Sequence, residues 1–211
     1  MQTRKGQSIE DESMRIIDAE VGKHTYDDKQ WNIVRRIIHS TADFDFIDKN
    51  KIIFHNYAIE MGINALKNGK SIVVDVNGVA GLLNKQNLAE FNNKLVCKIS
   101  DPTIAELAKK NNQTRSELSM LQSKEDIDRG IVVVGNAPTA LMQVIKMIKD
   151  QVVKPALVIG VPVGFVCAVE AKEQLQKIPT PFITNLGRKG GSSTAAAIVN
   201  ALFKILRESM S

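Results

Sequence analysis

Residues 131–160, IVVVGNAPTALMQVIKMIKDQVVKPALVIG, decide the fold class. The apolar run IVVVG is typical of a strand that is buried on both faces. The segment NAPTALMQVIKMIKD has the spacing of an amphipathic helix, and PALVIG reads as a second buried strand. Strands that alternate with helices in this way build a parallel sheet covered by helices.

The rest of the chain continues this alternation. After residue 160 we expect a helix in VCAVEAKEQLQ, a strand in PFITN and a long helix in STAAAIVNALFKILRES. Before residue 131 the same patterns predict strands at 51–54, 71–76 and 95–99, and helices at 8–20, 27–38, 55–68, 100–110 and 114–122. The sequence therefore predicts an α/β fold, with a mostly parallel sheet covered by helices on both faces. We expect a single domain over residues 1–211, with a helical N-terminal part.

Two of these helices carry start signals. Ser100 is expected to cap the helix that Pro102 opens. Thr114 and Glu117 have the spacing of a capping box.

The composition favours an anionic small molecule over a nucleic acid as the ligand. Hydrophobic residues make up 44% of 211 residues, enough for a full core, and the 28 Lys and Arg exceed the 23 Asp and Glu to give a net charge of +5. This charge is dispersed and lacks the dense basic clusters of a nucleic-acid surface, so no nucleic-acid partner is expected. Glycine and proline break the longest apolar runs, which argues against a membrane span.

The cysteines and the N-terminal segment indicate a cytoplasmic protein. Cys97 and Cys167 are far apart and show no metal-binding spacing, so we expect two reduced, buried thiols and no metal site. The N-terminal residues lack the apolar core of a signal peptide.

Three junctions between strands and helices are rich in glycine: GNAPTA (135–140), GVPVGF (160–165) and NLGRKGGSST (185–194). Ligands of parallel sheets bind at such junctions. In the first, Asn136 can cap the helix while Pro138 opens it, which would leave free N–H groups for carboxylate or phosphate oxygens. In the third, Arg188 and Lys189 add positive charge beside Gly190. Glycine also serves tight turns, but three such loops together favour a large anionic ligand.

Neither common nucleotide signature is present. VVVGNAPTAL lacks the three glycines of a dinucleotide-binding loop, and GRKGGSS lacks the Gly-Lys-Ser/Thr ending of a phosphate loop. A phosphate- or nucleotide-binding α/β enzyme therefore stays open only as an alternative.

His39 lies in RRIIHSTADFDF (35–46), where a helix is expected to end. An imidazole ordinarily gains or loses its proton near neutral pH, so His39 is a candidate proton donor. Ser40, Thr41 and Asp43 could orient one ring nitrogen, and Arg36, one turn earlier, could pair with a substrate carboxylate. The structural alternative is a histidine that binds the last helix carbonyls.

The other candidates are weaker. Arg115 and Ser116 begin a helix in TRSELSM, where the arginine could clamp an acid or form an ordinary salt bridge. His24, in a polar loop, and His55, at a helix start, are expected to be structural.

Six segments, in order and over most of the chain, resemble the precorrin-8X methylmutases of cobalamin biosynthesis. The combination of GNAPTAL, GVPVGFV and GRKGGS is the most specific part of this resemblance. The segments are SIEDESMRIIDAE, VRRIIHSTADFDF, CKISDPTIAELAKKNNQTRSELSM, VVVGNAPTALMQVI, PALVIGVPVGFVCAVEAKE and PFITNLGRKGGSSTAAAIVNAL.

The resemblance implies an isomerase. Such an enzyme moves one methyl group between adjacent ring carbons of a contracted tetrapyrrole, (cobalt-)precorrin-8, to give cobyrinate or hydrogenobyrinate. It implies no external cofactor, an α/β homodimer and a substrate bound near the subunit interface. A non-catalytic tetrapyrrole-binding protein is the further alternative.

The resemblance also implies roles for particular residues. The family's histidine falls on His39, its arginine on Arg36, and its Thr-Arg-Ser motif on Thr114, Arg115 and Ser116. The complete candidate site has His39 as the catalytic residue and, as substrate-binding residues, Arg36, Thr41, Arg115, Ser116, Asn136, Arg188, Lys189 and Gly190.

One segment departs from the family pattern. VVDVNGVAGLL (73–83) has Gly78 where the family usually shows methionine and Leu82 where it usually shows glycine. The resemblance implies that this loop helps to form the tetrapyrrole pocket. The spellings ADFDF and GRKGGS are closer to the cobalt-containing branch of the family.

Overall fold

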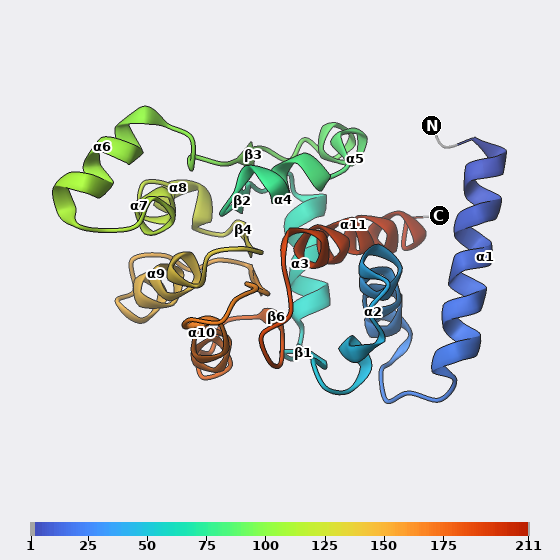
Figure 1. Cartoon of the computed structure of the whole chain (residues 1–211). Helices are drawn as coiled ribbons and strands as arrows, with labels where there is room; N and C mark the ends of the chain where they lie inside the picture. Colours follow the sequence, from blue (N-terminus) through green and yellow to red (C-terminus); the bar gives the residue numbers. More distant parts are fainter. Residues whose placement is uncertain (1–2, 211) are drawn as a thin grey trace.

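Six strands form one sheet in the computed structural model, which describes residues 3–210 (Figure 1). Residues 1–2 and 211 lie outside the described residues, so the predicted domain 1–211 extends slightly beyond them. The strand order is β1-β6-β5-β4-β2-β3. The strands are β1 (Ile52–Phe54), β2 (Ile72–Val74), β3 (Leu95–Val96), β4 (Ile131–Val134), β5 (Leu157–Gly160) and β6 (Phe182–Asn185).

The sheet is parallel except at one edge. β1 pairs antiparallel with β6, with Ile52 opposite Asn185, and all other neighbouring pairs are parallel. The predicted mostly parallel sheet is therefore confirmed. The strands are buried on both faces, since side chains such as Ile131 and Val132 alternate between two separate hydrophobic clusters.

Helices cover both faces of the sheet, as predicted. The cluster on one face unites α1, α2, α3, α4, α5 and α11, and the cluster on the other unites α7, α8, α9 and α10, with α6 packed outside α7 (Figure 1). The helices are α1 (Arg4–Val21), α2 (Asp28–Thr41), η1 (Phe44–Ile47, a 3-10 turn), α3 (Ala58–Lys67), α4 (Asn77–Leu82), α5 (Lys85–Glu90), α6 (Pro102–Asn111), α7 (Arg115–Leu121), α8 (Lys124–Ile127), α9 (Pro138–Lys149), α10 (Ala168–Leu175) and α11 (Ser192–Glu208).

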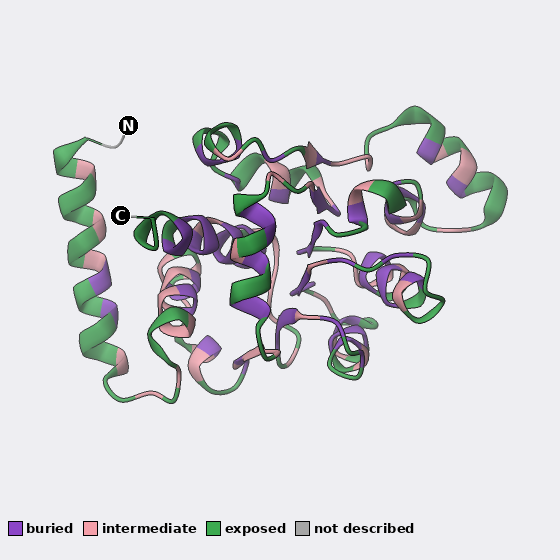
Figure 2. Cartoon of the chain, turned by 180° about the vertical axis from the view of Figure 1, so that it is seen from behind, coloured by how far each residue is buried: buried purple, intermediate pink, exposed green. Residues whose placement is uncertain are grey.

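The central helix on the first face is α11. It is buried along most of its length and packs against α2 in the most extensive helix contact of the protein (Figure 2). The N-terminal helix α1 lies on the outer side of α2 and is largely exposed, with only Met14 and Ile17 buried (Figure 2). None of the helices within residues 3–210 has the length and apolar character needed to cross a bilayer.

Several local expectations were wrong. The cap of α6 is Asp101, whose carboxylate accepts from the Thr103 N–H at 2.9 Å, whereas Ser100 accepts a hydrogen bond from Asn77. Serine and aspartate are about equally good caps, so the position decides, and Asp101 directly precedes the first helical residue. The Thr114–Glu117 capping box is confirmed.

The cysteines also differ from expectation. Cys97 is only half-buried and Cys167 is exposed, because Cys167 lies in the turn before α10 with a left-handed φ of 60°. The three shortest α-helices, α4, α5 and α8, carry too few turns to produce a periodic pattern and were not predicted.

Candidate functional site

The helix α2 places His39 at the margin of a packed interface. Its side chains Ile33, Val34, Ile37 and Ile38 are buried, and His39 lies in its last turn, two residues before the helix ends. The helix begins with a capping box at Asp27 and ends where Ala42 adopts a left-handed conformation with φ 51°. The predicted position of His39 near a helix end is therefore confirmed.

His39 borders a cavity of about 240 Å³, here called the His39 hollow, between α2, the end of α4 and α11. Arg36 lies in the same wall, as its one-turn spacing from His39 predicted. Leu82, one of the two departures from the family pattern, also lines it. The full lining is Arg36, His39, Ser40, Leu82, Ser193, Ala196, Ala197 and Asn200.

Two further cavities adjoin this hollow. One, of about 270 Å³, lies between α1 and α2 and shares His39. The other, of about 340 Å³, shares Arg36 and Asn200 and also contains the cationic side chains Lys204 and Arg207. The three cavities are together called the groove below, and His39 and Arg36 each line two of them.

The neighbours of His39 do not orient its ring as expected. The Ser40 and Thr41 hydroxyls donate to the Ile37 carbonyl, at 3.0 and 2.8 Å, which is the usual local bond of these residues inside a helix. Asp43 accepts from the Asp45 N–H at 3.0 Å and from Lys189. Within residues 3–210 the His39 ring has neither these partners nor a helix-end carbonyl. Its nitrogens are therefore available to a ligand in the groove.

Arg36 already has an anionic partner. Its guanidinium donates to the Glu10 carboxylate of α1 at 2.5 Å, and both side chains are about one-fifth exposed, at 22% and 20%. A substrate carboxylate that binds Arg36 must therefore share its guanidinium with Glu10 or displace Glu10 from it.

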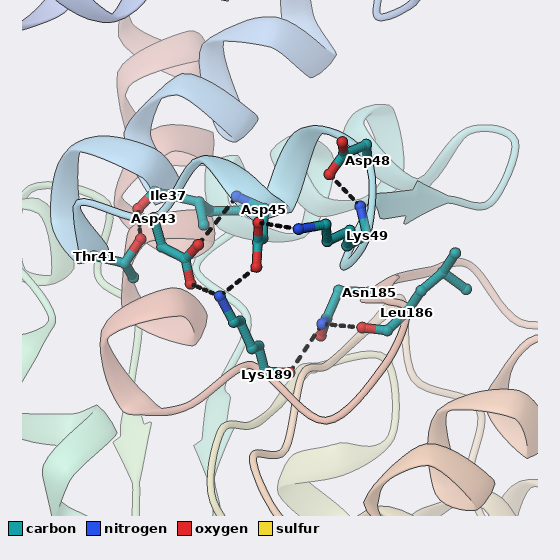
Figure 3. A network of polar contacts seen from close by, with 9 residues as sticks. All are labelled: Ile37, Thr41, Asp43, Asp45, Asp48, Lys49, Asn185, Leu186 and Lys189. Carbon is teal, nitrogen blue, oxygen red and sulfur yellow. Dashed lines mark hydrogen bonds and ion pairs between the residues drawn. The ribbon is translucent and has the colours of Figure 1, made fainter.

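Lys189 ties the third glycine-rich loop to the segment after α2 (Figure 3). Its ammonium donates to Asp43 and Asp45, both at 2.7 Å. The Asp43 carboxylate, followed by that of Asp45, raises the pKa of Lys189, and the bond from Lys189 lowers the pKa of Asp45. The positive charge expected for an anionic ligand is thus largely neutralised at Lys189.

The neighbours of Lys189 have different roles. The exposed Arg188 guanidinium lies 5.5 Å from the centre of the Phe165 ring and can reach a ligand. Gly190 has φ +150°, and a Cβ there would come within 2.2 Å of the Val161 carbonyl oxygen, so the close approach of two loops requires glycine.

An internal carboxylate fills the first glycine-rich loop. The strand order reverses between β2 and β4, where doubly wound sheets bind their ligands. The buried Asp75, directly after β2, accepts from the N–H groups of Gly135 at 3.0 Å, Asn136 at 2.8 Å and Ala137 at 2.8 Å. Burial raises the pKa of the Asp75 carboxyl, and the three N–H groups offset part of this effect.

The prediction of free N–H groups at this loop was therefore wrong, because the Asp75 carboxylate already accepts their hydrogen bonds. Asn136 does not cap α9 either, since the cap is Ala137 and no side chain bonds there. The exposed Asn136 side chain can still contact a ligand. The phosphate-binding alternative loses the N–H groups on which it depended.

The remaining candidates lie elsewhere. Arg115 borders a cavity of about 420 Å³ between α6 and α7, at the other end of the molecule from α2, and Ser116 follows it in α7 (Figure 1). His24 stacks on Trp31 with ring centres 4.1 Å apart, and His55 lies 5.4 Å from the Phe182 ring, as expected for structural histidines. Among residues 3–210, no three His, Cys, Asp or Glu side chains are grouped to hold a metal ion.

Comparison with known proteins identifies the family. The sequence profile of precorrin-8X methylmutase matches residues 8–205. The chain belongs to the precorrin-8X methylmutase family. The predicted enzyme class, an isomerase that moves a methyl group within one molecule, is thereby confirmed.

Two relatives of this methylmutase are 45% identical and are named cobalt-precorrin-8 methylmutase. The one from Priestia megaterium aligns over 95% of this chain and 88% of its own, and the one from Leptospira interrogans over 95% and 94%. A crystal structure of precorrin-8X methylmutase from Thermus thermophilus is 39% identical, covers 97% of this chain and 98% of its own, and has a TM-score of 0.89. These matches confirm both the family and the fold.

The methylmutase structure brings together only part of the predicted site. Arg36 and His39 meet in the hollow, Thr41 follows them, and Lys189 reaches the same segment through Asp43. Ser193 and Asn200 in the wall of the hollow, as well as Asp75, were not predicted from the sequence. The acid in the apolar run SIVVDV was the one available signal for Asp75, because a charge there needs a buried partner.

We expect Asp75→Ala to lower the free energy of unfolding by about 3 kcal/mol, because three buried N–H groups lose a charged acceptor. Urea unfolding measures this loss, with Glu173→Ala, an exposed carboxylate on α10, as the control. A variant within about 0.5 kcal/mol of the wild type would show that the carboxylate is not needed there.

Proposed function

We propose that this methylmutase moves one methyl group between adjacent ring carbons of (cobalt-)precorrin-8, giving cobyrinate or hydrogenobyrinate. The observation that carries the proposal is the imidazole of His39, which lies beside Arg36 in the groove and has no partner of its own within residues 3–210. The names of the two relatives at 45% identity support the same substrate class and favour the cobalt form.

The groove has the chemistry of such a substrate. A contracted tetrapyrrole is a flat, apolar ring fringed with carboxylates. Leu82, Ala196 and Ala197 offer apolar wall to the ring, and Arg36 and Lys204 offer charge to its carboxylates. The hollow of about 240 Å³ is too small for the whole ring, since ligand sites commonly measure roughly 300–1,000 Å³. The ring therefore extends over the adjoining cavities, with His39 beneath it.

His39 is the proton donor of this proposal. The protonated imidazole donates to a ring nitrogen next to the migrating methyl group and draws electron density from the conjugated ring. General acid catalysis of this kind contributes roughly 10²–10⁴ in rate, and rigid orientation of the ring supplies the remainder. The methyl group leaves one ring carbon and bonds to its neighbour, so no atom or electron is exchanged with a cofactor.

The metal state of the ring changes what His39 must do. In the metal-free ring a nitrogen lone pair can accept the proton. In the cobalt form the metal occupies the ring nitrogens and withdraws electron density as a Lewis acid. The loss of His39 should therefore cost more with the metal-free substrate.

A homodimer accounts for the remote candidates. The helix α7, which carries Arg115 and Ser116, lies at the opposite end of one protomer from α2, which carries His39 (Figure 1). A substrate bound at the interface of two copies would meet His39 from one copy and the Thr114–Ser116 segment from the other. We therefore propose that the protein is a homodimer. We also propose that residues 1–211 form a single domain and that the protein is cytoplasmic.

We expect His39→Asn to lower the turnover of metal-free precorrin-8 by roughly 10²–10⁴ while the protein stays folded. The matched control is His55→Asn, which changes a histidine outside the groove and should keep nearly full activity. Turnover is followed by the absorbance of the corrin product. A folded His39→Asn enzyme with near wild-type turnover would rule out the proton-donor role, and a loss of corrinoid affinity alone would indicate a role in product binding.

We expect two inactive variants, His39→Asn and Arg115→Met, to restore activity when they are unfolded and refolded together. In a symmetric dimer with shared sites, each mixed dimer has one site free of both substitutions, so equal mixing returns about a quarter of the wild-type activity. The separately refolded variants are the controls. If mixing restores nothing, the two residues do not serve one site from different copies.

A further inference from the structure

Lys172 is a buried cation, and no acidic side chain within residues 3–210 pairs with it. It lies on α10 with 1% of its surface exposed, and its ammonium donates to the Gly187 carbonyl at 3.0 Å and to the Lys189 carbonyl at 2.6 Å. Burial lowers the pKa of Lys172 to about 8. Burying a lysine costs free energy that two hydrogen bonds only partly offset. A buried ammonium at this position therefore indicates a role other than filling space in the core.

The two carbonyls belong to one irregular loop, residues 186–191, within the third glycine-rich junction. Gly187, Gly190 and Gly191 have φ values of +69°, +150° and +116°, which only glycine adopts readily. The buried Asn185 side chain donates to the Leu186 carbonyl at 2.7 Å and to the Lys189 carbonyl at 2.9 Å. Two buried donors, Lys172 and Asn185, therefore hold this loop from within (Figure 3 shows Asn185).

The outer side of the same loop meets the candidate site. Lys189 bridges Asp43 and Asp45, which follow α2 directly after the turn that contains His39 (Figure 3). The loop then leads into α11, whose residue Ser193 lines the His39 hollow. The other two side chains of the loop, Leu186 and Arg188, are exposed.

We propose that Lys172 is a positioning residue of the His39 site, which fixes the 186–191 loop so that Arg188 faces the substrate and Lys189 reaches Asp43 and Asp45. Lys172 itself touches no substrate, and it acts through the backbone of the loop. Its effect on ligand binding rests on the proposed function, whereas its hold on the loop does not.

The test compares Lys172→Met with Lys177→Met, an exposed lysine just beyond α10 that removes the same charge. Trypsin cleavage after Arg188 and Lys189 reports local opening of the loop, and absorbance titration with cobyrinate reports binding. In Lys172→Met we expect cleavage about 10-fold faster and affinity about 10-fold weaker, the effect of roughly one lost charged hydrogen bond. Lys177→Met should match the wild type in both.

Two further variants separate positioning from general destabilisation. Val144→Ala, in the core of α9, should lower the unfolding midpoint without faster cleavage at the loop. Lys189→Met should show coupling with Lys172→Met, so that the double variant binds cobyrinate no more weakly than the poorer single variant. If Lys172→Met does not fold, Lys172→Gln, which removes the charge and shortens the side chain, is compared with the wild type in the same way.

The outcomes are distinct. Wild-type cleavage in a folded Lys172 variant overturns the hold on the loop, whatever happens to binding. Faster cleavage with unchanged affinity, or additive losses in the double variant, overturns the role in the site. A wild-type protein that does not bind cobyrinate contradicts the proposed function and with it the role in the site, while the cleavage rates still decide the hold on the loop.

Discussion

The packing of α2 against α11 is the contact on which the candidate site depends. The buried side chains Ile33 and Ile37 fix the rotation of α2, and helical geometry then carries Arg36 and His39 to the edge of the interface. On the facing helix, Ala196 and Ala197 are small enough to leave the His39 hollow open. The position of the proposed proton donor is therefore a consequence of core packing, not of hydrogen bonds to the ring.

Buried charges explain why the glycine-rich loops are not simple anion sites. Asp75 occupies the N–H groups of the first loop from the side of β2, and Lys172 holds carbonyls of the third from the side of α10. In each loop a buried charged side chain binds the backbone, the carboxylate of Asp75 to N–H groups and the ammonium of Lys172 to carbonyl groups. In the proposed complex the contacts to an anionic substrate then fall to side chains, above all to Arg36 and Arg188, which suits a broad ring with scattered carboxylates.

Periodicity in the sequence predicted the elements, but not the contacts between distant loops. The strands and long helices followed from apolar runs and helical spacing, and the resemblance identified the family from loop motifs. The pairing of Lys189 with Asp43 joins residues 146 positions apart, and Asp75 bonds an N–H group 61 positions away. Such pairs depend on strand order, which the local pattern does not contain. Short helices such as α4, which carries Leu82 into the hollow, were not predicted for a local reason. Six residues are too few to show a helical periodicity.

In the proposed complex the ring of the substrate or product lies over the His39 hollow beside α2. A crystal structure of the protein with bound hydrogenobyrinate would show where the ring lies. We expect a ring nitrogen within about 3 Å of an imidazole nitrogen of His39, and a side-chain carboxylate of the ligand on Arg36. A ring bound out of reach of His39, for example only in the cavity between α6 and α7, would contradict it.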